Sequence, residues 1–321
     1  MKVLISSLAA VLLAQPVAAT AQQYPAKPLR IVVPFAPGGG SDFIARFIAQ
    51  RLTVGLGQQV IVENKPGAGG TIGSDLCAKA TPDGYTLVIS HASPLGIAPG
   101  IYPKLPYDAV RDLSAIIPLG SLPTVLVTSP DKGFKTIDEF VVAAKAKPGS
   151  FNYTSTGIGN ATHLNAERFR ASARIAAVHI PVKSGPEALT EVMSGRADFY
   201  FCPIGTALPF IRDGKLRSLV ISAPNRAAEL PDVPTTAEAG FVDADYALWI
   251  GLFTPAKTPR GIVDRLHNEI ANTMQSANVR GKLAALGVVP MPMTPEQFGA
   301  RVRDEIASNE TLVRAAGIRP E

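Results

Sequence analysis

Two glycine-rich turns, far apart in this 321-residue chain, carry the residues best suited to hold an anion. Each turn follows an apolar run typical of a strand and precedes a run typical of a helix. A helix N-terminus presents free backbone N–H groups and the positive end of the helix dipole, and glycines let a ligand approach that backbone closely. Two such turns facing each other across a cleft would hold a small molecule that carries carboxylates.

The first turn spans residues 37–42 and follows the strand-like run 30–35. Its backbone amides are expected to bind one carboxylate, directly or through ordered water. Asp42 would repel a carboxylate, so we expect it to cap the turn or to meet an amine or water. The candidate ligand-binding residues here are Phe35, Gly38, Gly39, Gly40, Ser41 and Asp42.

The second turn follows the run 151–155 and opens a helix with His163 in its first turn. Its hydroxyl and N–H groups would take a second polar end of the ligand. His163 either donates to a carboxylate, with a charge near pH 6.5 adding to the attraction, or orders the loop. The candidates at this turn are Thr154, Ser155, Thr156, Gly157, Gly159, Asn160 and His163.

Further candidates follow other strands. Ser90 and His91 end a strand at the edge where ligands bind in parallel sheets. Lys183 and Ser184 follow another strand, and Lys183 either pairs with a carboxylate or is solvated. Asp198 is a ligand contact or a buried carboxylate that accepts loop N–H groups.

The amino end has the pattern of an export signal. Lys2 precedes the apolar run 3–14, and residues 19–21 form a small-x-small site, so cleavage is expected after Ala21. The apolar run is shorter than the ~20 residues of a membrane span. We therefore expect residues 1–21 to be a signal peptide and the remainder to be a soluble periplasmic protein.

Composition narrows the function classes. The chain is 46% hydrophobic and 18% charged, and its net charge of +5 favours anionic ligands only slightly. Lysines and arginines are not clustered, so no nucleic-acid partner is expected. The two cysteines, Cys77 and Cys202, leave a disulfide and two buried thiols both open.

Enzyme signatures are missing from the sequence. It has no Gly-x-Ser-x-Gly elbow, no Walker phosphate loop and no dinucleotide fingerprint. Its four histidines show no metal-ligand spacing. We therefore expect neither catalysis nor a metal or other cofactor.

Strand and helix patterns alternate almost throughout, which indicates α/β layers. Helices are predicted to begin with Ser41 and Thr162 as N-caps. The predicted organisation is a discontinuous first lobe, residues 22–124 plus 224–321, and a second lobe, residues 125–223. Two chain crossings between them would form a hinge.

Short motifs spread over nearly the whole chain strengthen this interpretation. They are Tyr24-Pro-x-Lys-Pro-Leu-Arg-Ile-Val-Val-Pro-Phe-Ala-Pro-Gly-Gly-Gly-Ser-Asp42, Glu63-Asn-Lys-Pro-Gly-Ala-Gly-Gly70, Pro82-Asp-Gly-Tyr-Thr-Leu87, Tyr107-Asp108, Gly157-x-Gly-x-x-x-His-Leu164, Gly195-x-x-Asp198, Leu230-Pro-Asp-Val-Pro-Thr235, Glu238-Ala-Gly240 and Trp249. In this order and spacing they resemble the solute receptors of tripartite tricarboxylate transporters, the Bug family.

The resemblance implies a fold similar to type II periplasmic binding proteins, with two α/β lobes, a ligand cleft between them and two crossover strands. It also implies a monomeric, non-catalytic receptor that binds a small carboxylate and delivers it to a membrane permease. Asn160 departs from the family's usual Ser or Thr, while Val182 and Ser184 replace its usual tyrosine and glycine. Alternatives left open are a sensor subunit for a membrane kinase and a periplasmic hydrolase or isomerase.

Overall fold

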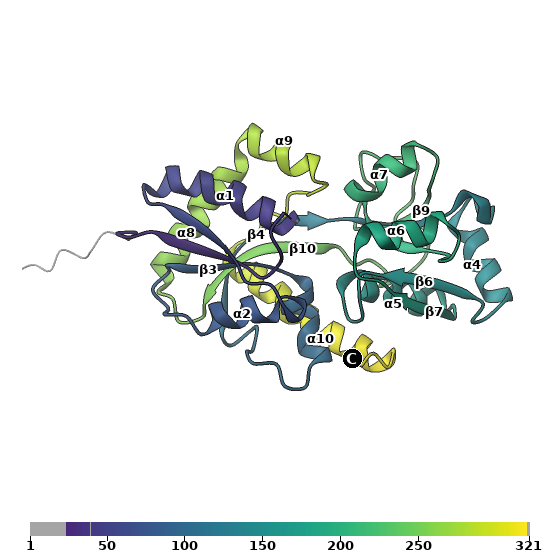
Figure 1. Cartoon of the computed structure of the whole chain (residues 1–321), viewed down its shortest axis with the longest axis horizontal. Helices are drawn as coiled ribbons and strands as arrows, with labels where there is room; N and C mark the ends of the chain where they lie inside the picture. Colours follow the sequence, from purple (N-terminus) through teal and green to yellow (C-terminus); the bar gives the residue numbers. More distant parts are fainter. Residues whose placement is uncertain (1–23, 39, 320–321) are drawn as a thin grey trace, which may run out of the picture.

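Three sheets divide the described part of the chain, residues 24–38 and 40–319, between two α/β lobes (Figure 1). The structure is a computed structural model. The predicted signal peptide and Gly39 lie outside the described residues. The type II periplasmic-binding-protein-like architecture is confirmed, and the strand-like runs 30–35 and 151–155 both contain strands.

The first lobe is built on a five-stranded sheet in the order β2-β1-β3-β10-β4. Strand β1 is parallel to β2 and β3, whereas β10 is antiparallel to β3 and β4. The strands are β1 (Leu29–Val33), β2 (Val60–Asn64), β3 (Thr86–His91), β4 (Leu113–Leu122) and β10 (Leu248–Pro255). The helical elements are α1 (Gly40–Leu56), η1 (Ala68–Gly70), α2 (Thr71–Ala78), η2 (Ser93–Ile97), α3 (Ala98–Ile101), α8 (Arg260–Gln275), α9 (Ala277–Ala285) and α10 (Pro295–Ala315).

Both faces of this sheet are covered by helices, which explains why β1 is almost continuously apolar. Successive side chains point to opposite faces of a strand. Ile31 therefore packs with α1 and α8, while Val32 packs with α2 and α10. The first lobe thus has two apolar cores, one on each side of the sheet.

The second lobe contains a three-stranded sheet in the order β8-β5-β9 and a parallel pair, β6-β7. Its strands are β5 (Thr124–Thr128), β6 (Phe151–Ser155), β7 (Ala177–Pro181), β8 (Tyr200–Pro203) and β9 (Arg217–Ser222). Its helical elements are η3 (Pro130–Lys132), α4 (Ile137–Ala146), α5 (Ala161–Ala173), α6 (Gly185–Met193) and α7 (Ile204–Arg212). Cys202 is buried in this lobe and Cys77 in the other, and both are free thiols.

The chain crosses between lobes twice. It passes from β4 to β5 through Pro123 and returns from β9 to β10 through residues 223–247. Much of this return segment packs on the second lobe, because Leu230 joins one of its cores and Ala244 the other. We therefore propose that the second lobe extends to about residue 244, rather than ending at 223 as the sequence suggested.

Two helix starts differ from expectation. Asn160, not Thr162, caps α5, with its side chain accepting the Thr162 N–H at 2.9 Å. Ser41 lies inside α1, one residue after its start. The helical segment 93–101 escaped prediction because its prolines and glycines are poor helix formers.

A buried carboxylate fixes α10 against the return strand. Glu305 accepts hydrogen bonds from Tyr246 Oη at 2.7 Å and from Trp249 Nε1 at 2.6 Å. Burial raises the pKa of Glu305. Farther along α10, Asn309 and Ser308 accept hydrogen bonds from Arg168 of α5, so this helix also joins the lobes.

Replacing Glu305 by Ala should lower the free energy of unfolding by about 2–5 kcal/mol, since two buried donors lose their acceptor. Chemical denaturation measures this loss. The neighbouring exposed Asp304→Ala is the matched control and should change stability by less than ~0.5 kcal/mol. Equal effects of the two substitutions would contradict this assignment.

Candidate functional site

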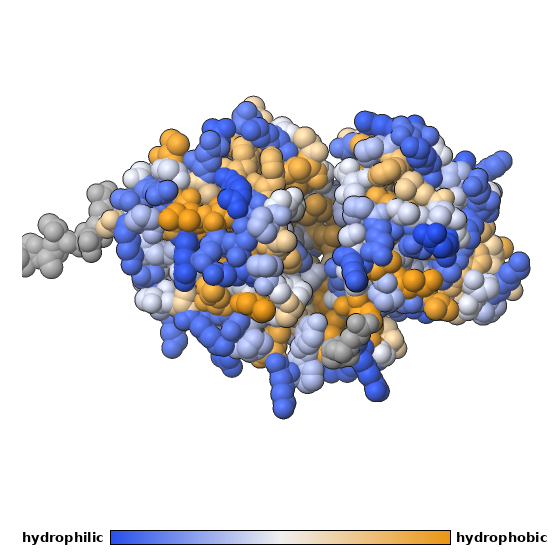
Figure 2. Space-filling model, viewed as in Figure 1, coloured by the Kyte–Doolittle hydropathy of each residue, from blue (hydrophilic) through white to orange (hydrophobic). Residues whose placement is uncertain are grey.

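The parallel strands of both lobes run toward the seam between them, where Figure 2 shows the surface hollowed. In the first lobe, β1 and β3 end side by side. In the second, β6 and β7 are parallel and end at Ser155 and Pro181. The N–H of Ala161, the first residue of α5, donates to Ser93 Oγ of η2 at 3.3 Å across the seam. The second glycine turn therefore borders the carboxyl edge of the first lobe's sheet.

The first turn is organised around Asp42. Its carboxylate accepts hydrogen bonds from Gly38 N at 2.9 Å, Arg46 Nε at 3.0 Å and Asn64 Nδ2 at 2.9 Å. Burial alone would raise the pKa of Asp42, but hydrogen bonds from these groups outweigh it and lower the pKa to about 2. Asp42 is thus a charged residue that shapes the turn, as one of the two sequence interpretations expected.

The rest of the first turn is open. Gly38 and Gly40 are exposed and Ser41 is half-buried, while Gly38 has the positive φ of +82° that favours glycine. No described atom lies within 4 Å of the position that a Gly40 Cβ would occupy. The amides that begin α1 are therefore accessible, and helix geometry leaves the first of them without internal partners.

His91 connects the first turn to the end of β3. Its ring stacks on Phe35 with centroids 4.3 Å apart, and its Nδ1 accepts the Ser93 N–H at 3.1 Å. Burial lowers the pKa of His91 to about 4, so the ring is neutral and carries its proton on Nε2. Ser90, by contrast, is fully buried and lies 3.5 Å from Ser74 Oγ of α2.

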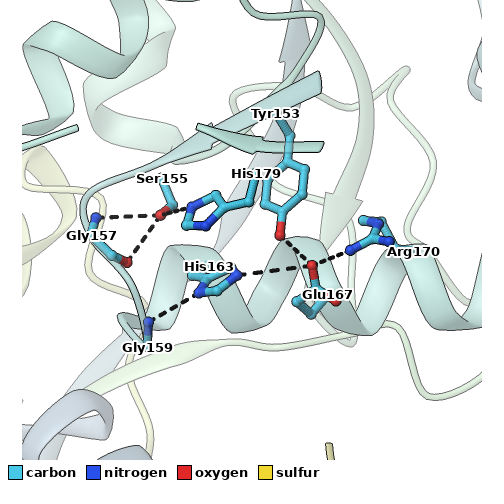
Figure 3. A network of polar contacts seen from close by, with 8 residues as sticks. All are labelled: Tyr153, Ser155, Gly157, Gly159, His163, Glu167, Arg170 and His179. Atoms are coloured by element: carbon cyan, nitrogen blue, oxygen red, sulfur yellow. Dashed lines mark hydrogen bonds and ion pairs between the residues drawn. The ribbon is translucent and has the colours of Figure 1, made fainter. Parts of the chain in front are cut away.

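The second turn is held by side chains that bond its own backbone (Figure 3). His163 Nδ1 accepts the Gly159 N–H at 3.0 Å, and Ser155 Oγ donates to Gly157 O at 3.0 Å. His179 Nε2 lies 2.7 Å from the same Ser155 Oγ. Thr162 Oγ1 also accepts the Thr156 N–H at 3.1 Å. These bonds preset the shape of the loop.

Two stacked imidazoles lie beneath this turn, with the His163 and His179 ring centroids 3.8 Å apart. The pKa of His163 is lowered to about 4, mainly by burial and secondarily by the charge of Arg170. The pKa of His179 is lowered to about 3, mainly by burial and secondarily by His163. The expectation that His163 is charged near pH 6.5 is therefore wrong. Its Nε2 faces Glu167 Oε1 at 3.9 Å, so its contacts are those of a loop-ordering residue.

Glu167 completes the network by accepting hydrogen bonds from Tyr153 and Arg170 (Figure 3). The sequence interpretation missed these three residues and His179. Glu167 and Arg170 follow His163 at helical spacings of four and seven residues, which places all three on one face of α5. That spacing is the signal that could have indicated the network.

Some predicted site residues lie elsewhere or act structurally. Asp198 pairs with Lys132 Nζ at 2.7 Å and accepts the Asn152 N–H at 2.8 Å. This is the amino end of β6, roughly 10 Å along the strand from Ser155. The structure therefore does not bring Asp198 to the second turn.

Two other predicted residues begin α6. Ser184 caps this helix by accepting the Glu187 N–H at 3.4 Å. Lys183 is exposed, and no described carboxylate lies within ion-pair distance of its ammonium. Thr154, in contrast, is fully buried at the end of β6, and its hydroxyl has no partner among the described residues.

Comparison with known proteins decides the family. The model for the tripartite tricarboxylate transporter family receptor matches residues 44–318. The chain belongs to this family. BugT of Bordetella pertussis is 36% identical to this receptor over 303 residues, which are 94% of the chain and 92% of BugT. The resemblance identified from sequence motifs is thus confirmed.

Solved structures agree with this receptor's fold. MatC of Rhodopseudomonas palustris with bound malate is 32% identical, with a TM-score of 0.76, covering 90% of this chain and 100% of MatC. A second R. palustris protein, solved with adipate, is 28% identical with a TM-score of 0.80 and covers 93% and 100%. Members of the family are periplasmic solute-binding receptors.

Within the described residues, no helix is long and apolar enough to cross a membrane. The same residues contain no group of three or more His, Cys, Asp or Glu placed to hold a metal ion.

The stacked histidines make stability depend on pH. In the unfolded chain, the imidazoles of His163 and His179 take up protons near pH 6.5. In the folded protein their pKa values are about 4 and about 3, respectively. The unfolded state therefore binds more protons in this window, and stability should fall as the pH falls from 6.5 toward 4. Thermal melts from pH 7.5 to 4 test this. His163→Gln should make the decline shallower, and an unchanged slope would contradict the assignment.

Proposed function

We propose that this receptor captures a small mono- or dicarboxylate between the first and second glycine turns and delivers it to a tripartite tricarboxylate-type membrane permease. The observation that carries the proposal is the Ala161–Ser93 hydrogen bond, which brings the start of α5 to the carboxyl edge of the first lobe's sheet, the edge from which the first turn also leaves β1. MatC and its R. palustris relative, with malate and adipate, support a carboxylate as the ligand class.

The first turn would hold one carboxylate with the backbone amides that begin α1. Asp42 does not oppose this, because its charge is already met by Arg46 and by two neutral donors. Neutral His91 offers its Nε2–H as a further donor beside the same turn. The acceptor oxygens of a carboxylate match this set of donors.

The second turn would hold the other polar end of the ligand. Candidate donors are the hydroxyls of Thr154 and Thr156, because the amides of residues 154, 156 and 157 already donate within the second lobe. His163 and His179 hold the loop in shape. A ligand that bridges both turns has higher affinity for the closed arrangement of the lobes and thereby shifts the population toward it. Binding in this mechanism needs no cofactor, metal or bond-breaking step.

The receptor's place in the cell is inferred from the predicted export signal. We propose cleavage after Ala21 and a monomeric periplasmic protein that docks on its permease and leaves. A sensor subunit for a membrane kinase would need the same binding site, so transport and sensing differ only in the step after capture. A hydrolase or isomerase would instead turn its ligand over.

Replacing Gly40 by Leu should block the first turn without disturbing the fold. The new side chain meets no described atom within 4 Å of its Cβ and needs no positive φ. It would occupy the space in front of the α1 amides, so affinity for malate or adipate should fall at least about tenfold. Isothermal titration measures the affinity, and the melting temperature without ligand should stay within a few degrees.

Gly261→Leu is the matched control, because Gly261 is also an exposed helical glycine with open space around its Cβ. It should leave ligand affinity unchanged. Unaltered affinity in Gly40→Leu would count against the first turn as a binding site. A panel of carboxylates in a thermal-shift assay would identify the ligand, since binding to the folded state raises the melting temperature.

Delivery is tested in cells. Uptake of the identified acid should be lost when the receptor gene is deleted, and should return with wild-type receptor but not with Gly40→Leu. Undiminished uptake together with a lost transcriptional response to the acid would favour the sensor.

A further inference from the structure

A second cavity lies entirely within the first lobe. It has a volume of 640 Å³, is partly open to solvent, and is lined by the edge strand β4, helices α8 and α9, and residues 288–297 (elements labelled in Figure 1). None of its lining residues belongs to either glycine turn. Its size is within the range of small-molecule sites, about 300–1,000 Å³.

The body of this cavity is apolar and adaptable. Three of the chain's five methionines line it: Met274, Met291 and Met293. Met274 packs on the core beside α1, while Met291 and Met293 pack on the core beside α10. The cavity therefore opens where the two cores of the lobe meet at the sheet edge. Methionine side chains are flexible and polarisable, so they adjust to ligands of varied shape.

Among the described residues, no further strand of the sheet pairs with the edge strand β4 on the side that faces the cavity. Pro118 has no N–H to offer there, and the Ile116 carbonyl at the edge is already taken by His267 Nδ1 at 2.9 Å. Since a carbonyl only accepts, Nδ1 carries a proton and is used in that bond. His267 thus stabilises the wall of the cavity.

One cation borders this apolar space. Arg280, on α9, lines the cavity and is exposed, and no described carboxylate lies within ion-pair distance of its guanidinium. The described lining residues include no Asp or Glu, so the cavity has a positive end with no internal counter-charge. Gln275 lines the same cavity and brings a neutral amide donor.

We propose that this cavity binds an amphipathic monocarboxylic acid, with its hydrocarbon body among the three methionines and its carboxylate on Arg280. A guanidinium matches a carboxylate with two parallel hydrogen bonds. A dicarboxylate fits poorly, because the described lining offers one lysine or arginine cation, Arg280, to pair with a carboxylate. Binding here engages one lobe only and is independent of lobe closure.

Methionine methyl groups report the site directly. In receptor labelled with ¹³C at methionine methyls, octanoate should shift the signals of Met274, Met291 and Met293. Met193 ends α6 in the other lobe and serves as the internal reference, which should not shift. Absence of shifts at the three cavity methionines with saturating octanoate, or equal shifts at Met193, would overturn the proposal.

Chemistry of the ligand is tested in the same experiment. Arg280→Gln should weaken octanoate binding about tenfold, whereas Arg265→Gln, an exposed arginine of α8 outside the lining, should not. Octanol lacks the charge and butyrate lacks the apolar length, so both should bind at least about tenfold more weakly than octanoate. Octanol binding as tightly as octanoate, or no effect of Arg280→Gln, would rule out an acid as the ligand.

Discussion

The direction of the parallel strands is the constraint on which the proposed site depends. A strand followed by a helix delivers the helix N-terminus to the carboxyl edge of its sheet, and both lobes turn that edge toward the seam. In the proposed site, the backbone amides without helical partners come from two distant parts of the sequence. A donor-rich, adjustable gap is the direct result of this topology.

Electrostatics inside the two turns follow a common plan. Each turn is supported by a carboxylate that accepts hydrogen bonds: Asp42 from Arg46 and two neutral groups, and Glu167 of α5 from Arg170 and Tyr153. The histidines nearby are held neutral by burial. The turns are therefore shaped by interactions that satisfy their own polar groups, and the proposed carboxylate contacts of the first turn fall on the amides that begin α1.

Sequence reasoning succeeded where the signal was local and failed where it was tertiary. The strand and helix pattern predicted α/β layers, because hydrophobic periodicity and glycine placement report backbone geometry directly. The type II periplasmic-binding-protein architecture was implied by the family resemblance. Asp198 was left open between a ligand contact and a buried carboxylate, because a sequence does not reveal which end of a strand faces the partner lobe. The structure agrees with the second interpretation, since Asp198 is buried and accepts the Asn152 N–H. The low pKa of His163 could not be predicted, because it comes from tertiary packing. The ring is buried against His179 of another strand, and Arg170 lies one helical turn or more further along α5.

The lobe boundary shows the same limitation. Residues 224–244 are rich in proline and polar residues, as a connecting loop is, yet Leu230 and Ala244 enter the cores of the second lobe. Glu305 gave no sequence signal either, since its partners Tyr246 and Trp249 lie almost sixty residues away. Contacts of this kind are fixed only when the whole chain has packed.

The course of α10 also bears on how this protein is handled in the laboratory. It is rooted in the first lobe through Glu305, and its later turns reach α5 of the second through Ser308 and Asn309 (Figure 1). Attaching the protein to a sensor chip or to a bulky fusion partner through its carboxyl terminus would therefore apply force to the contact between the two lobes. The start of β1, at the outer end of the first lobe, is a better attachment point for experiments that measure the motion of one lobe relative to the other.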